Sequence, residues 1–159
     1  MLSLTGRNLD GARPAGESML EQAHHRITIE TKRPGFTDVT AALAGWLKSI
    51  GAGDGLLTVF VRHTSASLTI QENADPDVLR DVTEALERAA PRHARYHHST
   101  EGPDDMPAHI KAMLTSTTLG IPVVAGKAVL GTWQAVYLIE HRDAPHSREI
   151  ALHYVGSRT

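Results

Sequence analysis

The segment GLLTVFVRHTSASLTI, residues 55–70, constrains the fold more than any other part of the chain. Its first half is a nearly continuous run of β-branched and apolar residues. Its second half alternates, with Leu68 and Ile70 two positions apart. The first pattern is typical of a buried strand and the second of a strand with one buried face. We therefore predict two strands that meet around residues 63–65, so the chain must build at least one β-sheet.

The other periodic segments do not alternate regularly between strand and helix, as parallel sheets require. Apolar residues at Val39, Leu43, Trp46 and Ile50 predict a helix over residues 37–50 that ends at Gly51. A second helix is predicted over residues 75–90, and residues 107–120 indicate a short third one. Further strands are predicted over residues 25–31, 121–124, 128–141 and 148–155. This order favours an α+β fold with mainly antiparallel sheets, two longer helices and one short helix.

Length and composition narrow the class of protein. A chain of 159 residues suits one domain with a single core. We expect residues 1–22, which begin with a segment rich in Gly, Ser, Asn and Asp, to be a disordered extension before a single domain over residues 23–159. The net charge of −2 predicts no nucleic-acid or membrane-surface partner. Without cysteine there is no thiolate chemistry, and without an apolar leader we expect a cytoplasmic protein.

The loop YHHSTEGPDDMPAHIK, residues 96–111, carries an unusual number of side chains that can bind metals. Neutral imidazole is a common zinc ligand, and three histidines with one water form a familiar open site. The spacing of these histidines matches no metal-binding motif, so spacing alone favours ordinary solvent-exposed histidines over a metal site. Glu101, Asp104 and Asp105 would then either orient histidine ligands or form turns and caps.

Polar residues at strand ends provide further candidates. The hydroxyls and backbone N–H groups of HTSAS, residues 63–67, could hold a phosphate or carboxylate. Gln134 interrupts an apolar strand and must find a hydrogen-bond partner, which could be a ligand or another subunit. Its neighbour Trp133 is expected to pack in the core. Glu140 and His141, at the far end of the same strand, could act as ligands or could simply be polar residues at the edge of the sheet.

Three separated motifs resemble the YjbQ family of secondary thiamine-phosphate synthases. They are HTSASLTIQENADPDVLRD, EGPDDMPAHIK and LGTWQAVYLIEHRDAPHSREIALHYVG, and the resemblance extends from residue 23 to residue 156. It implies two sheets packed as a sandwich, a homotrimer, and a divalent metal ion, expected to be zinc, held by His63, His98 and His109. Gln71 departs from the family, which commonly has Asn at that position. The resemblance carries over as further site candidates Ser65, Glu72, Asp75, Lys111, Gln134, Glu140 and Arg148.

The resemblance also implies an enzyme. The reaction would join hydroxymethylpyrimidine diphosphate to thiazole phosphate and release pyrophosphate, with a metal, Lys111 and Arg148 stabilising the leaving diphosphate. Ser65, Lys111, Gln134 and Arg148 would bind the substrate, and Glu72, Asp75, Glu101 and Glu140 are the catalytic candidates. Two alternatives stay open. One is a metal-dependent hydrolase of a small phosphorylated metabolite, with Glu101 or Asp105 as general base. The other is a non-catalytic trimeric protein that binds such a metabolite.

Overall fold

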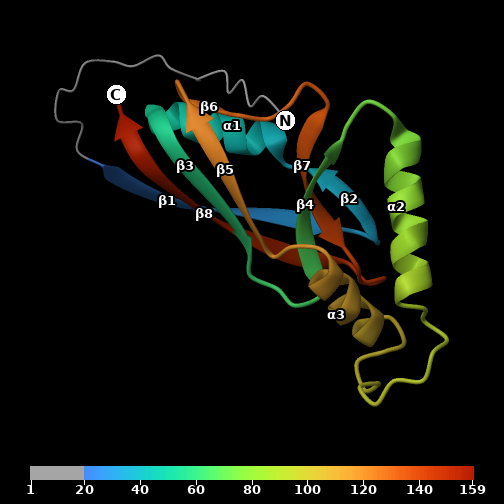
Figure 1. Cartoon of the computed structure of the whole chain (residues 1–159). Helices are drawn as coiled ribbons and strands as arrows, with labels where there is room; N and C mark the ends of the chain where they lie inside the picture. The colour runs from blue at the N-terminus through green and yellow to red at the C-terminus, as the bar shows by residue number, and fades with distance from the viewer. Residues whose placement is uncertain (1–19) are drawn as a thin grey trace, which may run out of the picture.

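A computed structural model describes residues 20–159, which form two antiparallel sheets and three helices (Figure 1). The larger sheet has the strand order β1-β8-β3-β5-β6 and the smaller one the order β2-β7-β4. The predicted α+β class and sandwich are confirmed. Most of the expected extension, residues 1–19, lies outside the described residues, and β1 begins at Glu21. The strands are β1 (Glu21–Thr31), β2 (Gly35–Asp38), β3 (Ala52–Val61), β4 (Ala66–Glu72), β5 (Thr118–Val124), β6 (Lys127–Ala128), β7 (Gln134–Glu140) and β8 (His146–Arg158).

The helices are α1 (Thr40–Ser49), α2 (Pro76–Ala89) and α3 (Asp105–Leu114). The predicted cap of α2 is confirmed, because the Asp75 carboxylate accepts the Asp77 N–H at 2.9 Å. Gly51 follows α1 with a φ of +63°, the left-handed conformation that ends many helices. None of the helices in residues 20–159 is long and apolar enough to cross a membrane.

Three local differences from the predicted elements matter. The segment Gly35–Asp38 is a strand that pairs with β7, so α1 begins at Thr40 instead of residue 37. The α3 helix begins at Asp105, two residues before the proline expected to start it. Trp133 is 63% exposed, so its expected place in the core is wrong. The strand begins one residue later, at Gln134, and the indole therefore lies on the loop that precedes it.

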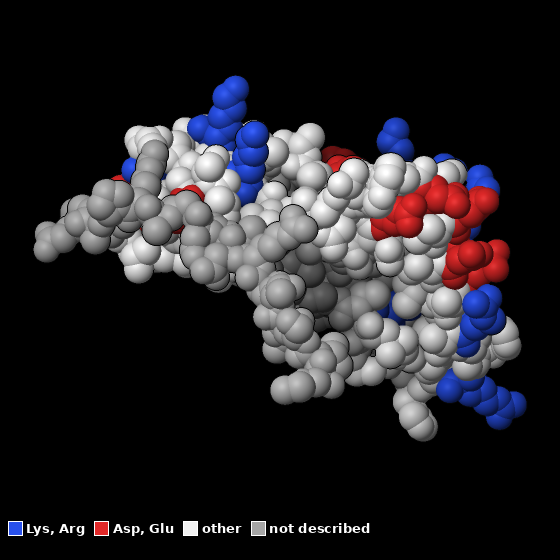
Figure 2. Space-filling model, turned by 45° about the horizontal axis from the view of Figure 1, so that its top comes forward, with Lys and Arg blue, Asp and Glu red and all other residues white. Residues whose placement is uncertain are grey.

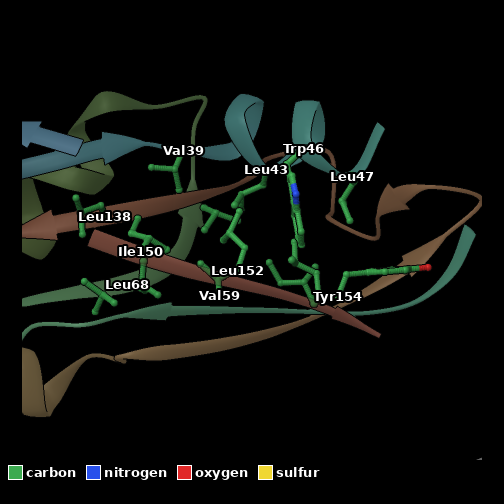
Figure 3. Close-up of a cluster of buried hydrophobic side chains, with 14 of the residues drawn as sticks. Val39, Leu43, Trp46, Leu47, Val59, Leu68, Leu138, Ile150, Leu152 and Tyr154 are labelled. Atoms are coloured by element: carbon green, nitrogen blue, oxygen red, sulfur yellow. The ribbon is translucent and has the colours of Figure 1, made fainter. Parts of the chain in front are cut away.

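The hydrophobic core lies between the two sheets and is closed by α1 (Figure 3). Alternate residues of β3 point inward, so Leu57 and Val59 are buried while Leu56 and Phe60 are each 42% exposed. Burial of aliphatic side chains contributes about 25 cal/mol per Å² of apolar surface, which is the main stabilisation available to a chain with few aromatics. The labelled core residues in Figure 3 are Val39, Leu43, Trp46, Leu47, Val59, Leu68, Leu138, Ile150, Leu152 and Tyr154.

Charged side chains are unevenly spread over the surface. On the face seen in Figure 2, Lys and Arg stand in separate groups, and Asp and Glu gather on the flank where α2 lies. Exposed acids of this helix include Asp77, Asp81 and Glu84.

Candidate functional site

Two histidines and an aspartate converge where the His-rich loop enters α3. Asp105 Oδ2 lies 2.6 Å from His98 Nε2 and 3.4 Å from His109 Nε2. One nitrogen or oxygen atom from each of the three residues lies within 4.8 Å of the other two. The helix creates this group, because Asp105 and His109 stand four residues apart and therefore share one face of α3.

The three side chains differ strongly in exposure. The Asp105 side chain is 2% exposed, whereas those of His98 and His109 are 42% and 32% exposed. The carboxylate therefore forms the floor of the group and the two imidazoles form its solvent-facing rim. A small molecule can reach the rim directly, which a buried structural group would not allow.

Backbone contact fixes the orientation of the His109 ring. Its Nδ1 lies 3.0 Å from the Thr64 carbonyl oxygen. A carbonyl oxygen only accepts, so Nδ1 carries the hydrogen, and in the neutral ring the Nε2 lone pair points towards Asp105. This is the arrangement in which histidine ligands are commonly held.

Arg142 anchors the N-terminal end of α3 to the β7–β8 connection. Its guanidinium donates to Asp104 Oδ2 at 2.9 Å, to the Asp105 carboxylate, and to the Glu101 carbonyl at 2.8 Å. Burial opposes the charged form of Asp104. Hydrogen bonds from the Asp143 N–H and Arg142 outweigh burial and lower the pKa of Asp104. Asp105 is consequently held by Arg142 on one oxygen and presents the other to the histidines.

A buried ion pair lies at the end of β7 near this group. Arg148 donates to both carboxylate oxygens of Glu140, at 2.6 and 2.7 Å, and to Ser65 Oγ at 3.2 Å. Thr31 Oγ1 also donates to Glu140, at 2.6 Å. Burial alone would raise the pKa of Glu140, but the hydrogen bonds from Arg148 and Thr31 outweigh it and hold the pKa below its ordinary value.

Beside this pair, a chain of hydrogen bonds leads from His141 to α3. His141 Nε2 lies 2.8 Å from Ser67 Oγ, which lies 2.6 Å from Thr115 Oγ1, which lies 2.7 Å from the Lys111 carbonyl oxygen. The carbonyl only accepts, so Thr115 donates to it, Ser67 donates to Thr115, and His141 Nε2–H donates to Ser67. Burial, and then the positive charge of Lys111, lower the pKa of His141 to about 4.

His141 should therefore make stability depend on pH. Its ordinary pKa of 6.5 falls to about 4 in the folded chain, so between these values the unfolded chain binds the proton and the folded chain does not. The free energy of unfolding should fall by about 3 kcal/mol from this group as pH drops from 7.5 to 4. Urea titrations of wild type and His141→Gln at several pH values measure it. A wild-type-minus-variant difference that is constant with pH would contradict the assignment.

A cleft of about 500 Å³ opens beside His98. Arg92, Arg95 and Tyr96 line it together with His98 and Met106. Arg92 already pairs with Asp143 and lies 3.8 Å from Glu87. Arg95 has no ion-pair partner within residues 20–159, so its charge is available to an anion in the cleft.

The structure brings several sequence-predicted site residues to this end of the molecule. His98 and His109 are in the three-residue group, and Ser65, Glu140 and Arg148 are in the buried network. Lys111 is buried and pairs with Glu87 of α2.

His63 lies outside the three-residue group. Its Nε2 accepts the Glu149 N–H at 2.9 Å, and burial with the nearby charge of Arg148 lowers its pKa. Metal binding by His63 therefore stays a prediction, and the ligand atom would have to be Nδ1.

Three other candidates lie at the opposite end of the β4–β7 pair. Ala66 pairs with Glu140, whereas Glu72 pairs with Gln134, so about 20 Å of strand separates the two ends. Gln134 accepts the Gly131 N–H at 2.8 Å, and Asp75 caps α2. Glu72 is half-buried at the end of β4. Within one chain these residues do not meet the histidines, and Glu101 contributes only its carbonyl to the contacts described above.

Some members of the site were missed at the level of sequence. Asp105 was considered only as an orienting group or a base, although its spacing from His109 places both on one helical turn. Arg142 lies within the third quoted motif but was not singled out as a candidate, and Arg95 lies outside all three motifs. Only the fold shows that Arg142 spans from the β7–β8 connection to α3, because this contact joins residues 37 positions apart.

A family model described as UPF0047 protein YjbQ-like matches residues 25–157. The UPF0047 protein sll1880 of Synechocystis is 50% identical over 131 residues, which are 82% of this chain and 89% of the relative. The UPF0047 protein YjbQ of Escherichia coli O157:H7 is 42% identical over 125 residues, 78% of this chain and 91% of the relative.

Solved structures of related proteins share the fold of this chain. The crystal structure of a conserved YjbQ/UPF0047 family protein from Clostridium acetobutylicum has a TM-score of 0.75 at 37% identity, covering 80% of this chain and 97% of that one. A hypothetical protein from Aeropyrum pernix has a TM-score of 0.78 at 30% identity, covering 85% and 99% of the two chains.

Proposed function

Because this chain belongs to the YjbQ (UPF0047) family, we propose that it is a metal-dependent enzyme that displaces pyrophosphate or phosphate from a small phosphorylated metabolite. One observation carries this proposal. Two imidazole nitrogens and a carboxylate oxygen converge within 4.8 Å of one another at a solvent-facing rim. Three protein ligands that leave one position open are typical of catalytic rather than structural zinc.

The donor set fits a divalent metal such as zinc. Ligand atoms at 2.0–2.1 Å from a tetrahedral centre lie about 3.3 Å apart. The 3.4 Å between Asp105 Oδ2 and His109 Nε2 matches that separation, whereas the 2.6 Å to His98 Nε2 is a direct hydrogen bond that would have to lengthen on metal binding. His98, Asp105 and His109 would hold the ion, with Thr64 and Arg142 orienting two of them. When bound, the ion would supply Lewis acidity that polarises a phosphate oxygen.

The cleft beside His98 supports a phosphorylated substrate. Its volume of about 500 Å³ is within the usual range for small-molecule sites. Arg95, which has no ion-pair partner among the described residues, offers a guanidinium, and this group suits phosphate oxygens better than an ammonium does. The Tyr96 ring provides an apolar surface against which a flat heterocycle can stack.

Thiamine-phosphate formation is the reaction favoured by the resemblance of the sequence. The thiazole nitrogen would attack the methylene carbon of hydroxymethylpyrimidine diphosphate, and the carbon–oxygen bond would break with its electron pair leaving on pyrophosphate. Arg95 would bind the diphosphate and Tyr96 would position the pyrimidine. Hydrolysis is the second candidate, because the exposed imidazoles let water reach the same place.

A homotrimer and a cytoplasmic location form part of the same proposal. The outer face of β3 carries Leu56 and Phe60, which are each 42% exposed. Apolar side chains on an open sheet face favour contact with another chain. In such an assembly, Glu72, Asp75 and Gln134 of one chain could lie next to the histidine group of a second chain.

The test uses the purified full-length chain before and after chelation. We expect about one divalent metal ion per chain, formation of thiamine phosphate from the two substrates, and loss of this product on chelation while the native mass stays that of a trimer. Product is measured by chromatography and pyrophosphate by a coupled assay. Pyrophosphate released without thiazole phosphate would favour hydrolysis. Substrate binding without turnover would favour the non-catalytic alternative, and a chain that binds no metal would contradict the proposal.

A further inference from the structure

An apolar cavity of about 530 Å³ lies far from His98 and His109, between α1 and the β5–β6 hairpin. Ala52, at the start of β3, lines it, whereas Val61 at the other end of β3 leads to the His63–Thr64 loop. Nine residue steps along a strand span about 30 Å. The cavity is therefore separate from the proposed enzyme site.

The hairpin that forms one wall is held in a fixed conformation. Ala125 and Gly126 both have positive φ, +48° and +77°, as two-residue hairpin turns require. The Ala125 N–H donates to Asp54 Oδ1 at 2.7 Å, and the Gly126 N–H donates to the Gly53 carbonyl at 3.0 Å. A Cβ at Gly126 would lie 2.6 Å from the Ala52 carbonyl oxygen. Left-handed backbone at an alanine is uncommon, and these contacts impose it, so the cavity wall is preformed.

The lining is apolar at the bottom and cationic at the mouth. The half-buried side chains of Ala128 and Leu130 form its accessible apolar surface, and Leu43 and Val136 also line it but are 2% and 0% exposed. Lys48 and Lys127 also line the cavity and are exposed. Neither ammonium group has an ion-pair partner within residues 20–159. Two unpaired cations above an apolar cavity are complementary to a molecule with an anionic head and an apolar body.

We infer that this cavity binds an amphipathic organic anion, with its carboxylate or sulfonate at Lys48 and Lys127 and its apolar part against Ala128 and Leu130. The volume is typical of sites for small organic molecules, which are mostly apolar and carry a few polar groups that fix orientation. The charge of the two lysines selects an anion over a neutral molecule of the same shape. This inference does not depend on the proposed enzymatic function.

The probe is 8-anilinonaphthalene-1-sulfonate, an aromatic sulfonate that fluoresces in apolar surroundings. We expect one site per chain on the full-length protein. Ala44→Trp, which fills the cavity from an exposed position of α1, should weaken binding at least about 10-fold, because the indole removes the space for the dye. Ala42→Trp is the matched control, since Ala42 is exposed on α1 but does not line the cavity.

Competition tests the role of charge. Octanoate should displace the dye at a lower concentration than octanol, and Lys48→Gln/Lys127→Gln should reduce that preference about 3- to 10-fold. A double variant at Lys32 and Arg33, both exposed and outside the cavity, controls for net charge. Equal effects of Ala44→Trp and Ala42→Trp, or a preference for octanoate that survives loss of the lysines, would overturn the inference. If the wild-type chain binds no dye and Ala44→Trp changes the native mass, a second copy covers the cavity and the inference is overturned.

Discussion

Replacement of His98 by alanine is expected to weaken divalent-metal binding at least about 100-fold and to remove the proposed turnover with it. Loss of an outer partner of a metal ligand alone commonly costs 10- to 100-fold in affinity, so loss of a ligand should cost more. His98 is suited to this test because its side chain is 42% exposed, so truncation leaves no buried cavity. Zinc affinity is measured by competition with a chromophoric chelator.

The adjacent histidine supplies the control. His97 stands one position away in the same loop, is exposed, and is not one of the three converging residues. His97→Ala should keep wild-type metal content, affinity and turnover. If the two variants behave alike, the metal is held elsewhere or not at all, and the group made by His98, Asp105 and His109 has another role.

The architecture could be predicted because strand and helix periodicities are strong in this chain. The run at residues 55–70 became β3 and β4, and the apolar stripe at residues 75–90 became α2. Gly35–Asp38 was missed as a strand because four residues carry too little periodicity, and its pairing with β7 is a tertiary contact. Trp133 was misplaced because aromatic character alone predicts burial, whereas the strand begins one position after it.

The site was harder to predict because it depends on where one helix begins. Pro107 suggested a start at residue 107, since proline favours the first turn, but the first three N–H groups of a helix are all unpaired and proline fits at any of them. With the start at Asp105, that carboxylate and His109 share one turn. The sheet register then determines which of the other candidate residues lie near the histidines. It places Glu140 beside the histidine end of the fold and Gln134 about 20 Å away, which no local pattern reveals.

The buried pair of Glu140 and Arg148 connects stability to this end of the fold. Their side chains are 1% and 3% exposed, and Arg148 also donates to the carbonyl and hydroxyl of Ser65, next to the Thr64 carbonyl that orients His109. Two guanidinium nitrogens of Arg148 donate to the two carboxylate oxygens of Glu140, one to each. A role for either residue in binding or catalysis stays a prediction, but their fixed pairing already implies that they position the loop that holds His109.

Arg148→Met is therefore expected to lower the free energy of unfolding by about 3–5 kcal/mol, because it leaves the Glu140 carboxylate buried without its partner. The midpoint of thermal unfolding should fall by about 10 °C or more. Glu140→Gln/Arg148→Met should recover part of this loss, because no uncompensated charge remains. Arg80→Met, which breaks the exposed pair with Asp77, should change stability by less than about 1 kcal/mol. Urea unfolding of the four proteins measures these differences, and an Arg148→Met variant as stable as Arg80→Met would show that the pair does not hold this end of the fold together.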